Sequence, residues 1–393
     1  MNKKKILFLA LWFLPQIGGM EMSSYEVVKI LRQLGHTVQV VTADHPEAAA
    51  FDAQQSFGIC RAKGVLLKNL GLGNPARRAV YYLRYYHAYY RLVKTAIRDF
   101  APDEIIVADE QTRNWFGFYA GRIPYRPIVI ASMPERREDT VKIRVVSKTL
   151  NRAKAVYCVS NSTKEKLCEA FGEKYRTKMF VLYRSISTDF TEAPVREDAV
   201  RALRERYGTN GKFTFLSVCR LSDKKGMGDL VEAVHLLGEQ AQSCKFLICG
   251  DGPEKENLTN QICAYGLENT VVLCGQVSKE QIADYYDLCD CFVLPSVEES
   301  FGRVFVEAGS RGKASIGCAI GGVVEVIDHG QTGHLVAPNN PRQLAEALEK
   351  LKNEPAYTRS LAENMTEKVQ KNFTFSALKE KWGNILDQEH EHV

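Results

Sequence analysis

Several common signatures are missing from this sequence of 393 residues, and each absence excludes a class of protein. No run of 18 apolar residues occurs, so we expect no membrane-spanning helix. The eleven cysteines form no Cys-x-x-Cys, and many stand inside apolar runs. This usage favours reduced, buried thiols in the cytoplasm over a disulfide framework or a zinc site. The net charge of +5 is too mild to indicate a nucleic-acid binder.

Three short ligand motifs are also absent. There is no Asp-x-Asp, and the eight histidines show no spacing typical of metal ligands, so we expect neither a metal nor another cofactor. The dinucleotide fingerprint Gly-x-Gly-x-x-Gly is missing, which counts against an oxidoreductase. The absence of Gly-x-x-x-x-Gly-Lys-Ser/Thr excludes a P-loop phosphotransferase.

The first apolar run follows three lysines and imitates a signal peptide. It covers residues 6–14, ends at Pro15 without a small-residue cleavage site, and is followed by an amphipathic helix. We therefore predict a buried first strand over residues 6–14.

Short apolar runs alternate with amphipathic helical patterns along the rest of the chain. This alternation is typical of a parallel sheet covered by helices on both faces. A polar stretch at 184–198, which we interpret as a linker, separates two such series. After 6–14, the predicted strands are 38–42, 104–107, 128–131, 155–159 and 180–182, then 213–218, 244–249, 270–273 and 291–294.

We therefore expect an α/β protein of two Rossmann-like, doubly wound domains that face one another across a ligand cleft. The N-terminal domain is expected over residues 1–188 and the C-terminal domain over 189–372. Residues 373–393 are predicted to form a helix that returns to the N-terminal domain. The region 46–74 carries no pattern that we can assign.

The strongest motif lies where the strand predicted at 291–294 ends and a helix begins near Gly302. Glu299 stands in the loop, and Glu307 stands roughly a turn and a half into the helix. Backbone N–H groups at a helix start favour anions, and two carboxylates could accept hydrogen bonds from hydroxyls of one ligand. From the residues alone, compensation of the helix dipole beside a solvated glutamate is the simpler interpretation.

A second motif follows the strand predicted at 213–218. Arg220 and Lys225 stand in a basic loop before a helix start, which suits a diphosphate whose negative charge grows as it leaves. Ordinary solvated side chains are the alternative. Gly18 and Gly19 form a turn between the first strand and the first helix, where backbone can approach a ligand closely, although glycines are common in such turns.

In this order the segments resemble the GT-B retaining glycosyltransferases of family 4 (group 1). The resemblance rests on the patterns Gly-Gly-x-Glu, Arg-Leu-x-x-x-Lys-Gly, Gly-x-Gly-Pro, Glu-x-Phe-Gly-x-x-x-x-Glu and Gly-Gly-x-x-Glu. Here they stand at residues 18–21, 220–226, 250–253, 299–307 and 321–325. The last four cover the C-terminal half densely, while the N-terminal half matches loosely.

The resemblance implies a role for each residue of a donor site. Arg220 and Lys225 would bind the donor diphosphate and act in catalysis with Glu299, which would contact the transferred sugar. Glu307 would bind the ribose hydroxyls of the nucleotide. The resemblance further implies contacts to the sugar and phosphates from Gly18, Gly19, Gly252, Phe301, Gly302 and Arg303. Family members retain the anomeric configuration and need no metal.

The sequence departs from the family pattern at three positions. Ser132 stands where the family often has a histidine, so a histidine contact to the sugar cannot be carried over. Arg303 stands where an aliphatic residue is usual, and Cys219 stands where glycine is usual. These differences leave open which sugar is bound and whether Ser132 takes the histidine's place.

A basic, tyrosine-rich helix is predicted at 77–98. Its arginines recur every seven residues, which puts them along one slowly drifting face beside an apolar stripe. Such a helix could sit on an anionic membrane surface, but a core helix with a solvated charged face is the favoured interpretation. The arginines are Arg77, Arg84, Arg91 and Arg98, and the stripe is Tyr82, Tyr85, Tyr86, Tyr89 and Val93.

We therefore predict a cytoplasmic retaining glycosyltransferase that moves a sugar from a UDP- or GDP-linked donor. The acceptor would be a glycan or a lipid-linked molecule bound by the N-terminal domain, in assembly of a cell-surface polysaccharide. The inner face of the membrane would be its location if the helix at 77–98 binds lipid. Two alternatives stay open: a non-catalytic partner protein that keeps the scaffold, and a dinucleotide-dependent oxidoreductase.

Overall fold

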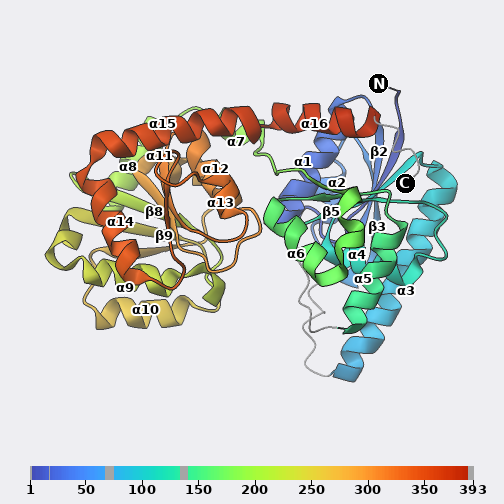
Figure 1. Ribbon diagram of the computed structural model, residues 1–393, viewed down its shortest axis with the longest axis horizontal. Coiled ribbons are helices and arrows are strands. Elements are labelled where there is room, and N and C mark those ends of the chain that lie inside the picture. Colours follow the sequence, from blue (N-terminus) through green and yellow to red (C-terminus); the bar gives the residue numbers. More distant parts are fainter. Residues whose placement is uncertain (1, 17, 67–74, 133–139, 388–393) are drawn as a thin grey trace. The chain divides into compact units, whose positions relative to one another are not determined.

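The computed structural model describes all residues except 1, 17, 67–74, 133–139 and 388–393 (Figure 1). The chain divides into two compact units. Unit 1 comprises residues 1–185 and 375–393, and unit 2 comprises residues 186–374. The domain boundaries expected at 188 and 372 lie within a few residues of the two points where the chain passes from one unit to the other.

Unit 1 is built on a seven-stranded parallel sheet in the order β3-β2-β1-β4-β5-β6-β7. Its strands are β1 (Lys5–Leu9), β2 (Thr37–Asp44), β3 (Gly58–Leu66), β4 (Glu104–Val107), β5 (Ile128–Ala131), β6 (Ala155–Cys158) and β7 (Met179–Val181). Its helices are α1 (Gly19–Gln33), α2 (Ala48–Asp52), α3 (Pro75–Phe100), α4 (Glu110–Tyr119), α5 (Thr140–Arg152), α6 (Asn161–Phe171) and α16 (Phe375–Asp387), with a 3-10 turn η2 (Glu173–Lys178).

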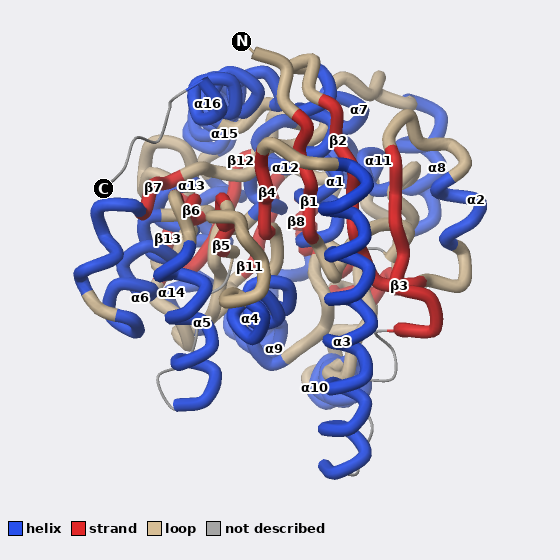
Figure 2. The backbone as a smooth tube through the Cα atoms, turned by 90° about the vertical axis from the view of Figure 1, so that its right-hand side faces the viewer, coloured by secondary structure: helices blue, strands red, loops and turns tan. Residues whose placement is uncertain are grey.

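The two faces of this sheet carry separate apolar cores, because successive strand residues point to opposite sides. Ile6 and Phe8 of β1 pack into a core that includes side chains of α1 and α16. Leu7 and Leu9 pack into a second core with side chains of α3, α4, α5 and α6. Helices therefore cover both faces, as a parallel sheet requires, and Figure 2 shows β1 and β4 in the middle of unit 1.

The first strand is shorter than predicted. It ends at Leu9 instead of residue 14. Beyond it, the backbone N–H of Leu11 donates to Thr112 Oγ1 at 2.7 Å, and that of Trp12 donates to Asp109 Oδ2 at 3.3 Å. The N–H of Ala10 still donates to the Val41 carbonyl oxygen of β2 at 3.1 Å. At Leu11 and Trp12, side chains at the start of α4 replace a neighbouring strand as hydrogen-bond partners. The region 46–74, which carried no assignable pattern, holds α2 and the edge strand β3.

The C-terminal helix returns to unit 1, as the sequence predicted. Trp382 of α16 is fully buried in the core beside α1. The Lys4 ammonium group donates to the Leu386 carbonyl oxygen at 2.8 Å, although the two residues lie at opposite ends of the chain. Residues 388–393 of the expected C-terminal segment lie outside the described residues.

Unit 2 repeats the architecture with a six-stranded parallel sheet in the order β10-β9-β8-β11-β12-β13. Its strands are β8 (Phe213–Val218), β9 (Cys244–Cys249), β10 (Val271–Gly275), β11 (Cys291–Leu294), β12 (Ala314–Cys318) and β13 (His334–Val336). Its helices are α7 (Thr188–Thr191), α8 (Glu197–Tyr207), α9 (Met227–Leu236), α10 (Lys255–Ala264), α11 (Ile282–Leu288), α12 (Arg303–Ser310), α13 (Val323–Val326), α14 (Pro341–Asn353) and α15 (Pro355–Asn372), with 3-10 turns η3 (Asp223–Lys225) and η4 (Gly238–Ser243).

The burial of Trp382 predicts that the stability of unit 1 depends on α16. Replacing a buried Trp by Ala removes apolar contacts and leaves a cavity, so Trp382→Ala should lower the free energy of unfolding by about 3–5 kcal/mol. Chemical denaturation followed by circular dichroism measures this change. Glu380→Ala, on the exposed face of the same helix, should change stability by less than about 0.5 kcal/mol. Equal effects of the two substitutions would contradict this role of α16.

Candidate functional site

The strand order of unit 2 reverses direction between β8 and β11. From β8 the chain continues outward to β9 and β10, whereas from β11 it continues to β12 and β13 on the other side. The loops that follow β8 and β11 therefore start side by side at the carboxyl edge of the sheet and then lead in opposite directions. Such a switch point is where open parallel sheets bind ligands. The two strongest motifs of the sequence, at 220–226 and 299–307, begin in these loops.

A pair of opposite charges joins the two loops. The Lys225 ammonium group donates to Glu299 Oε2 at 2.7 Å, and both side chains are about four-fifths buried. The backbone reinforces the contact, because the N–H of Val297 donates to the Lys224 carbonyl oxygen at 2.9 Å. Lys224 itself forms a more exposed ion pair with Glu298. The structure therefore brings Lys225 and Glu299 together from positions 74 residues apart in the chain.

The glycine motifs of unit 2 allow the neighbouring loops to pack closely. A Cβ atom at Gly252 would lie 2.2 Å from the Leu221 carbonyl oxygen, so only glycine fits between the loops after β8 and β9. Gly302 precedes α12 with a φ of 87°, which is the left-handed region that favours glycine. The N–H of Gly322 donates to the Glu299 carbonyl oxygen at 3.1 Å, which fixes the loop after β12 against the same motif.

The carboxylate of Glu307 lies in α12, one turn beyond Arg303. Its Oε1 accepts from Arg303 Nε at 3.0 Å, and its Oε2 accepts from the Tyr286 hydroxyl at 3.0 Å. No pattern in the sequence connects Tyr286 with this motif, because Tyr286 stands in a different helix, α11. Burial and the nearby Glu307 charge raise the pKa of Tyr286 well above its usual range, so the phenol stays protonated and donates.

The remaining candidates in unit 2 differ in exposure. Arg220 is exposed and has no ion-pair partner among the described residues. Phe301 is buried, with its ring 5.6 Å from that of Phe373. Burial raises the pKa of Cys219 to about 12, so this residue in the family's glycine position carries a neutral thiol. The edge of unit 2 thus combines several basic side chains and carboxylates with the N-terminus of α12.

Gly18 and Gly19 belong to unit 1, where they precede and begin α1. Gly18 is extended, with a φ of −171°, and the Glu21 carboxylate lies against it. Arg184 Nη1 donates to the Gly19 carbonyl oxygen at 3.1 Å and to Ser23 Oγ at 2.9 Å. Arg184, from the polar stretch expected to be only a linker, therefore fixes the start of α1.

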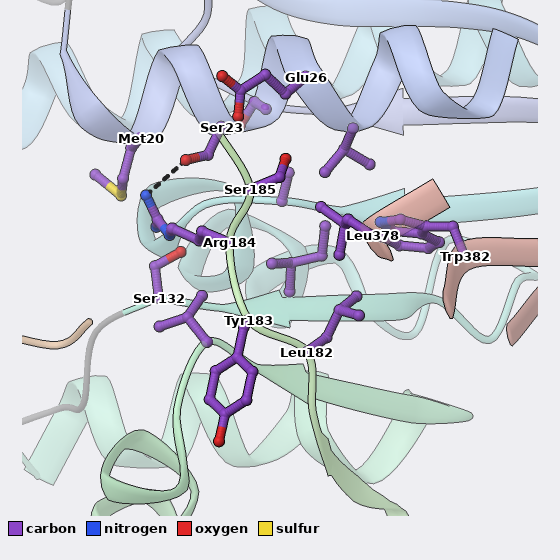
Figure 3. A pocket seen from close by; sticks show the side chains of 15 residues that line it. Met20, Ser23, Glu26, Ser132, Leu182, Tyr183, Arg184, Ser185, Leu378 and Trp382 are labelled. Carbon is purple, nitrogen blue, oxygen red and sulfur yellow. Dashed lines mark hydrogen bonds between the residues drawn. The ribbon is translucent and has the colours of Figure 1, made fainter. Parts of the chain in front are cut away.

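A small pocket of about 30 Å³ opens beside these residues in unit 1 (Figure 3). It is lined by α1, by Ser132 after β5, by residues 182–185 and by α16. Ser185 Oγ and Trp382 Nε1 are buried there and have no hydrogen-bond partner among the described residues. Ser132, which stands in the family's histidine position, is 5% exposed. Its neighbours Met133 and Pro134 lie outside the described residues.

Helix α3 has one buried and one exposed face. Tyr85, Tyr89 and Val93 are buried in the core, so the interpretation as a core helix is correct for this stripe. The opposite face is basic and ends in two exposed apolar side chains, Val80 (51% exposed) and Leu83 (72% exposed). Its exposed basic residues are Arg84, His87, Arg91, Lys94 and Arg98, whereas the side chain of Arg77 lies outside the described residues. In Figure 2 the first turns of α3 extend past the sheet.

The described residues offer neither a metal site nor a membrane span. His, Cys, Asp and Glu side chains form no group of three or more that could hold a metal ion. No helix there is long and apolar enough to cross a bilayer. All eleven cysteines are free thiols. The expectation of activity without a metal stays a prediction.

Comparison with known families accounts for both units. The family model "Glycosyl transferases group 1" matches residues 200–372, and the model "Glycosyltransferase Family 4" matches residues 17–190. Together these matches cover most of the chain. The chain therefore belongs to the group 1, family 4 glycosyltransferases, and its two Rossmann-like units are those of the GT-B fold.

Individual relatives match only part of the chain, at identities near 30%. The α-D-kanosaminyltransferase of Streptomyces kanamyceticus is 32% identical over 183 residues, which are 47% of each chain. A GDP-mannose-dependent α-(1-6)-phosphatidylinositol monomannoside mannosyltransferase of Mycobacterium tuberculosis is 29% identical over 49% of this chain and 51% of its own. The matches thus span about half the length of these relatives. The structure of Anabaena HepE with UDP and glucose has a TM-score of 0.80 at 22% identity and covers 98% of this chain and 99% of its own, which shows a shared fold.

The close loop packing predicts that Gly226, at the end of the 220–226 motif, cannot be replaced. It has a φ of 65°, and a Cβ there would lie 2.0 Å from the Pro295 carbonyl oxygen. Gly226→Ala should therefore lower the free energy of unfolding by about 2 kcal/mol or more. Gly228→Ala, two residues later in α9, meets its nearest atom at 3.5 Å and should leave stability unchanged or raise it by up to about 1 kcal/mol. Denaturation curves that moved equally for both would contradict the packing described.

Proposed function

We propose that the protein transfers a sugar from a nucleoside diphosphate sugar to an acceptor, with retention of anomeric configuration and without a metal. The observation that carries this proposal is the Lys225–Glu299 pair at the switch point of unit 2, beside the N-terminus of α12. A cation, a carboxylate and the N-terminus of a helix at one sheet edge suit a ligand that joins a diphosphate to a hydroxyl-rich sugar.

The diphosphate would bind Arg220 and Lys225. Arg220 is exposed, so its guanidinium can reach a ligand. An ammonium group has three donors, so Lys225 can keep its hydrogen bond to Glu299 while it contacts a phosphate oxygen. Negative charge accumulates on the diphosphate as the bond to the sugar breaks, and fixed cations stabilise that charge where it develops. Glu299, held by Lys225, would contact the transferred sugar.

The nucleoside would be held through its ribose. Glu307 offers a carboxylate whose two oxygens have lone pairs beyond those used by Arg303 and Tyr286. Backbone groups of Phe301, Gly302 and Arg303 lie between Glu299 and Glu307 and would contact sugar and phosphate. The solved structure of HepE contains UDP and glucose, and the mycobacterial relative is GDP-mannose-dependent, so both UDP and GDP donors are candidates.

The acceptor would bind unit 1, whose sequence follows the family pattern less closely. We propose a glycan or a lipid-linked acceptor, used in assembly of a cell-surface polysaccharide by a cytoplasmic enzyme. The phosphatidylinositol monomannoside named for the mycobacterial relative is an acceptor of the lipid-linked kind. The exposed face of α3 supports an anionic membrane surface as a further partner, because it combines basic residues with Val80 and Leu83.

The donor assignment predicts different effects for the two glutamates. Glu307→Gln keeps the shape but removes the charge, and a hydrogen bond to a charged group is worth about 1.5–3 kcal/mol, so affinity for the nucleoside diphosphate should fall about ten- to a hundredfold. Glu299→Gln should leave that affinity nearly unchanged but lower turnover, since its contact would be to the transferred sugar. Titration calorimetry with UDP and GDP measures the affinities, and an assay of sugar transfer measures turnover. The same assay with and without a chelator tests metal independence.

If the two glutamates only compensate helix dipoles, each variant should lose at most about 1 kcal/mol of stability and neither should lose ligand selectively. Unchanged nucleotide affinity in Glu307→Gln would refute the ribose assignment. Turnover that stops in chelator and returns with magnesium or manganese would refute metal independence.

The membrane assignment predicts that charge on α3 controls binding to lipid. Each basic residue near an anionic surface contributes about 1 kcal/mol, so wild type should sediment with vesicles that contain phosphatidylglycerol. The double variant Arg84→Glu, Arg91→Glu should lose this binding. Arg201→Glu, Arg204→Glu in α8 makes the same change in net charge on an exposed helix of unit 2 and should sediment like wild type. If all three proteins sediment equally with the vesicles, or if none of them does, the membrane assignment is wrong and α3 is only a core helix.

A further inference from the structure

The carboxylate of Glu307 is held from two helices before any ligand arrives. Arg303 contacts Oε1 from the preceding turn of α12, and Tyr286 contacts Oε2 from α11. The Arg303–Glu307 pair has the spacing of an ordinary helical ion pair, which is worth little by itself. The Tyr286 contact is different, because it links the carboxylate to another element of the fold.

Tyr286 is placed so that its hydroxyl can reach little else. The side chain is fully buried, and its ring packs against those of Phe190 and Phe292, each with centroids 5.7 Å away. The only other acceptor described for the hydroxyl is the Val304 carbonyl oxygen at 3.5 Å, against 3.0 Å for Glu307. A buried hydroxyl that gives up its acceptor is costly, so this hydrogen bond favours one rotamer of Glu307.

The two helices that make this contact are fixed to each other by a buried ion pair. Asp287, the residue after Tyr286, accepts from Arg311 Nε at 2.8 Å, and both side chains are less than 10% exposed. Arg311 also donates to the Ala193 carbonyl oxygen at 2.6 Å. The end of α12 is therefore anchored beside Tyr286, so the Tyr286–Glu307 distance is set by the fold and not by a flexible surface.

We propose that Tyr286 is a positioning residue of the nucleotide site, which orients the Glu307 carboxylate toward the ribose hydroxyls. This inference rests on the proposed function, because Glu307 is there assigned to the ribose. A glutamate without this partner has to be immobilised when the nucleotide binds, whereas Tyr286 immobilises it when the protein folds. Loss of the hydroxyl should therefore weaken the ribose contact without touching the diphosphate contacts.

The experiment compares Tyr286→Phe with wild type using UDP and 2′,3′-dideoxy-UDP, with the two guanosine nucleotides in parallel. Wild type should prefer UDP or GDP over its dideoxy form by about ten- to a hundredfold. Tyr286→Phe should bind the complete nucleotide about three- to tenfold more weakly and the dideoxy form as wild type does. Calorimetry measures the dissociation constant of each protein for each nucleotide. The ratio between the complete and dideoxy forms is the readout that a purely structural role would not change.

Tyr285→Phe is the matched control on the same helix. Tyr285 is also buried, and its hydroxyl forms a hydrogen bond with that of Tyr207 at 2.9 Å, away from Glu307. This variant should lose similar stability and keep the wild-type preference ratio. Melting curves establish that both variants are folded at the assay temperature. In a Glu307→Gln background, Tyr286→Phe should cause no further loss of affinity.

The outcomes separate this inference from the proposed function. A wild type that binds the complete and dideoxy nucleotides equally would overturn the ribose assignment and the role of Tyr286 together. A normal wild-type preference that survives in Tyr286→Phe, or an equal loss for both nucleotides, would overturn the role of Tyr286 alone.

Discussion

The site depends on the adjacency of β8 and β11 at the point where the strand order reverses. Neighbouring parallel strands put their carboxyl ends at one edge, and chain paths that diverge from there leave room for a ligand between the loops. Lys225 and Glu299 join the two loops at 2.7 Å, and close backbone contacts hold them in register. The charges of Lys225 and Glu299 are thereby fixed beside the first turn of α12, whereas on a flexible loop they would be solvated.

In unit 2 the sequence predicts four of the six strands and both loop motifs, because these signals are local, but it does not predict β12 and β13. The strand at 291–294 has the predicted bounds, and the motifs at 220–226 and 299–307 lie in the loops expected from the alternation of strands and helices. Two long-range contacts also follow from no pattern in the sequence. β1 ends early because Asp109 and Thr112, about a hundred residues away, take its hydrogen bonds. The contact of Tyr286 with Glu307 likewise depends on how α11 packs against α12, which no spacing in the sequence encodes.

Unit 1 repeats the architecture but places different side chains around its pocket. Its sheet also reverses direction, between β1 and β4, but the loops there are joined by hydrogen bonds to the buried side chains of Asp109 and Thr112. No ion pair equivalent to Lys225–Glu299 joins these loops among the described residues. Arg184, Ser132 and the buried polar atoms of Ser185 and Trp382 lie instead around a small pocket closed by α16. A charged edge in one unit and a mostly apolar pocket with a few polar groups in the other suit two chemically different substrates.

We propose that the donor nucleotide binds the carboxyl edge of the unit 2 sheet. A crystal structure of the protein with UDP or GDP tests it most directly. We expect the ribose hydroxyls within hydrogen-bond distance of the Glu307 carboxylate and phosphate oxygens in contact with Arg220 and Lys225. The Tyr286 hydroxyl should still donate to Glu307. A nucleotide bound elsewhere, with Glu307 contacted only by Arg303 and Tyr286, would contradict it.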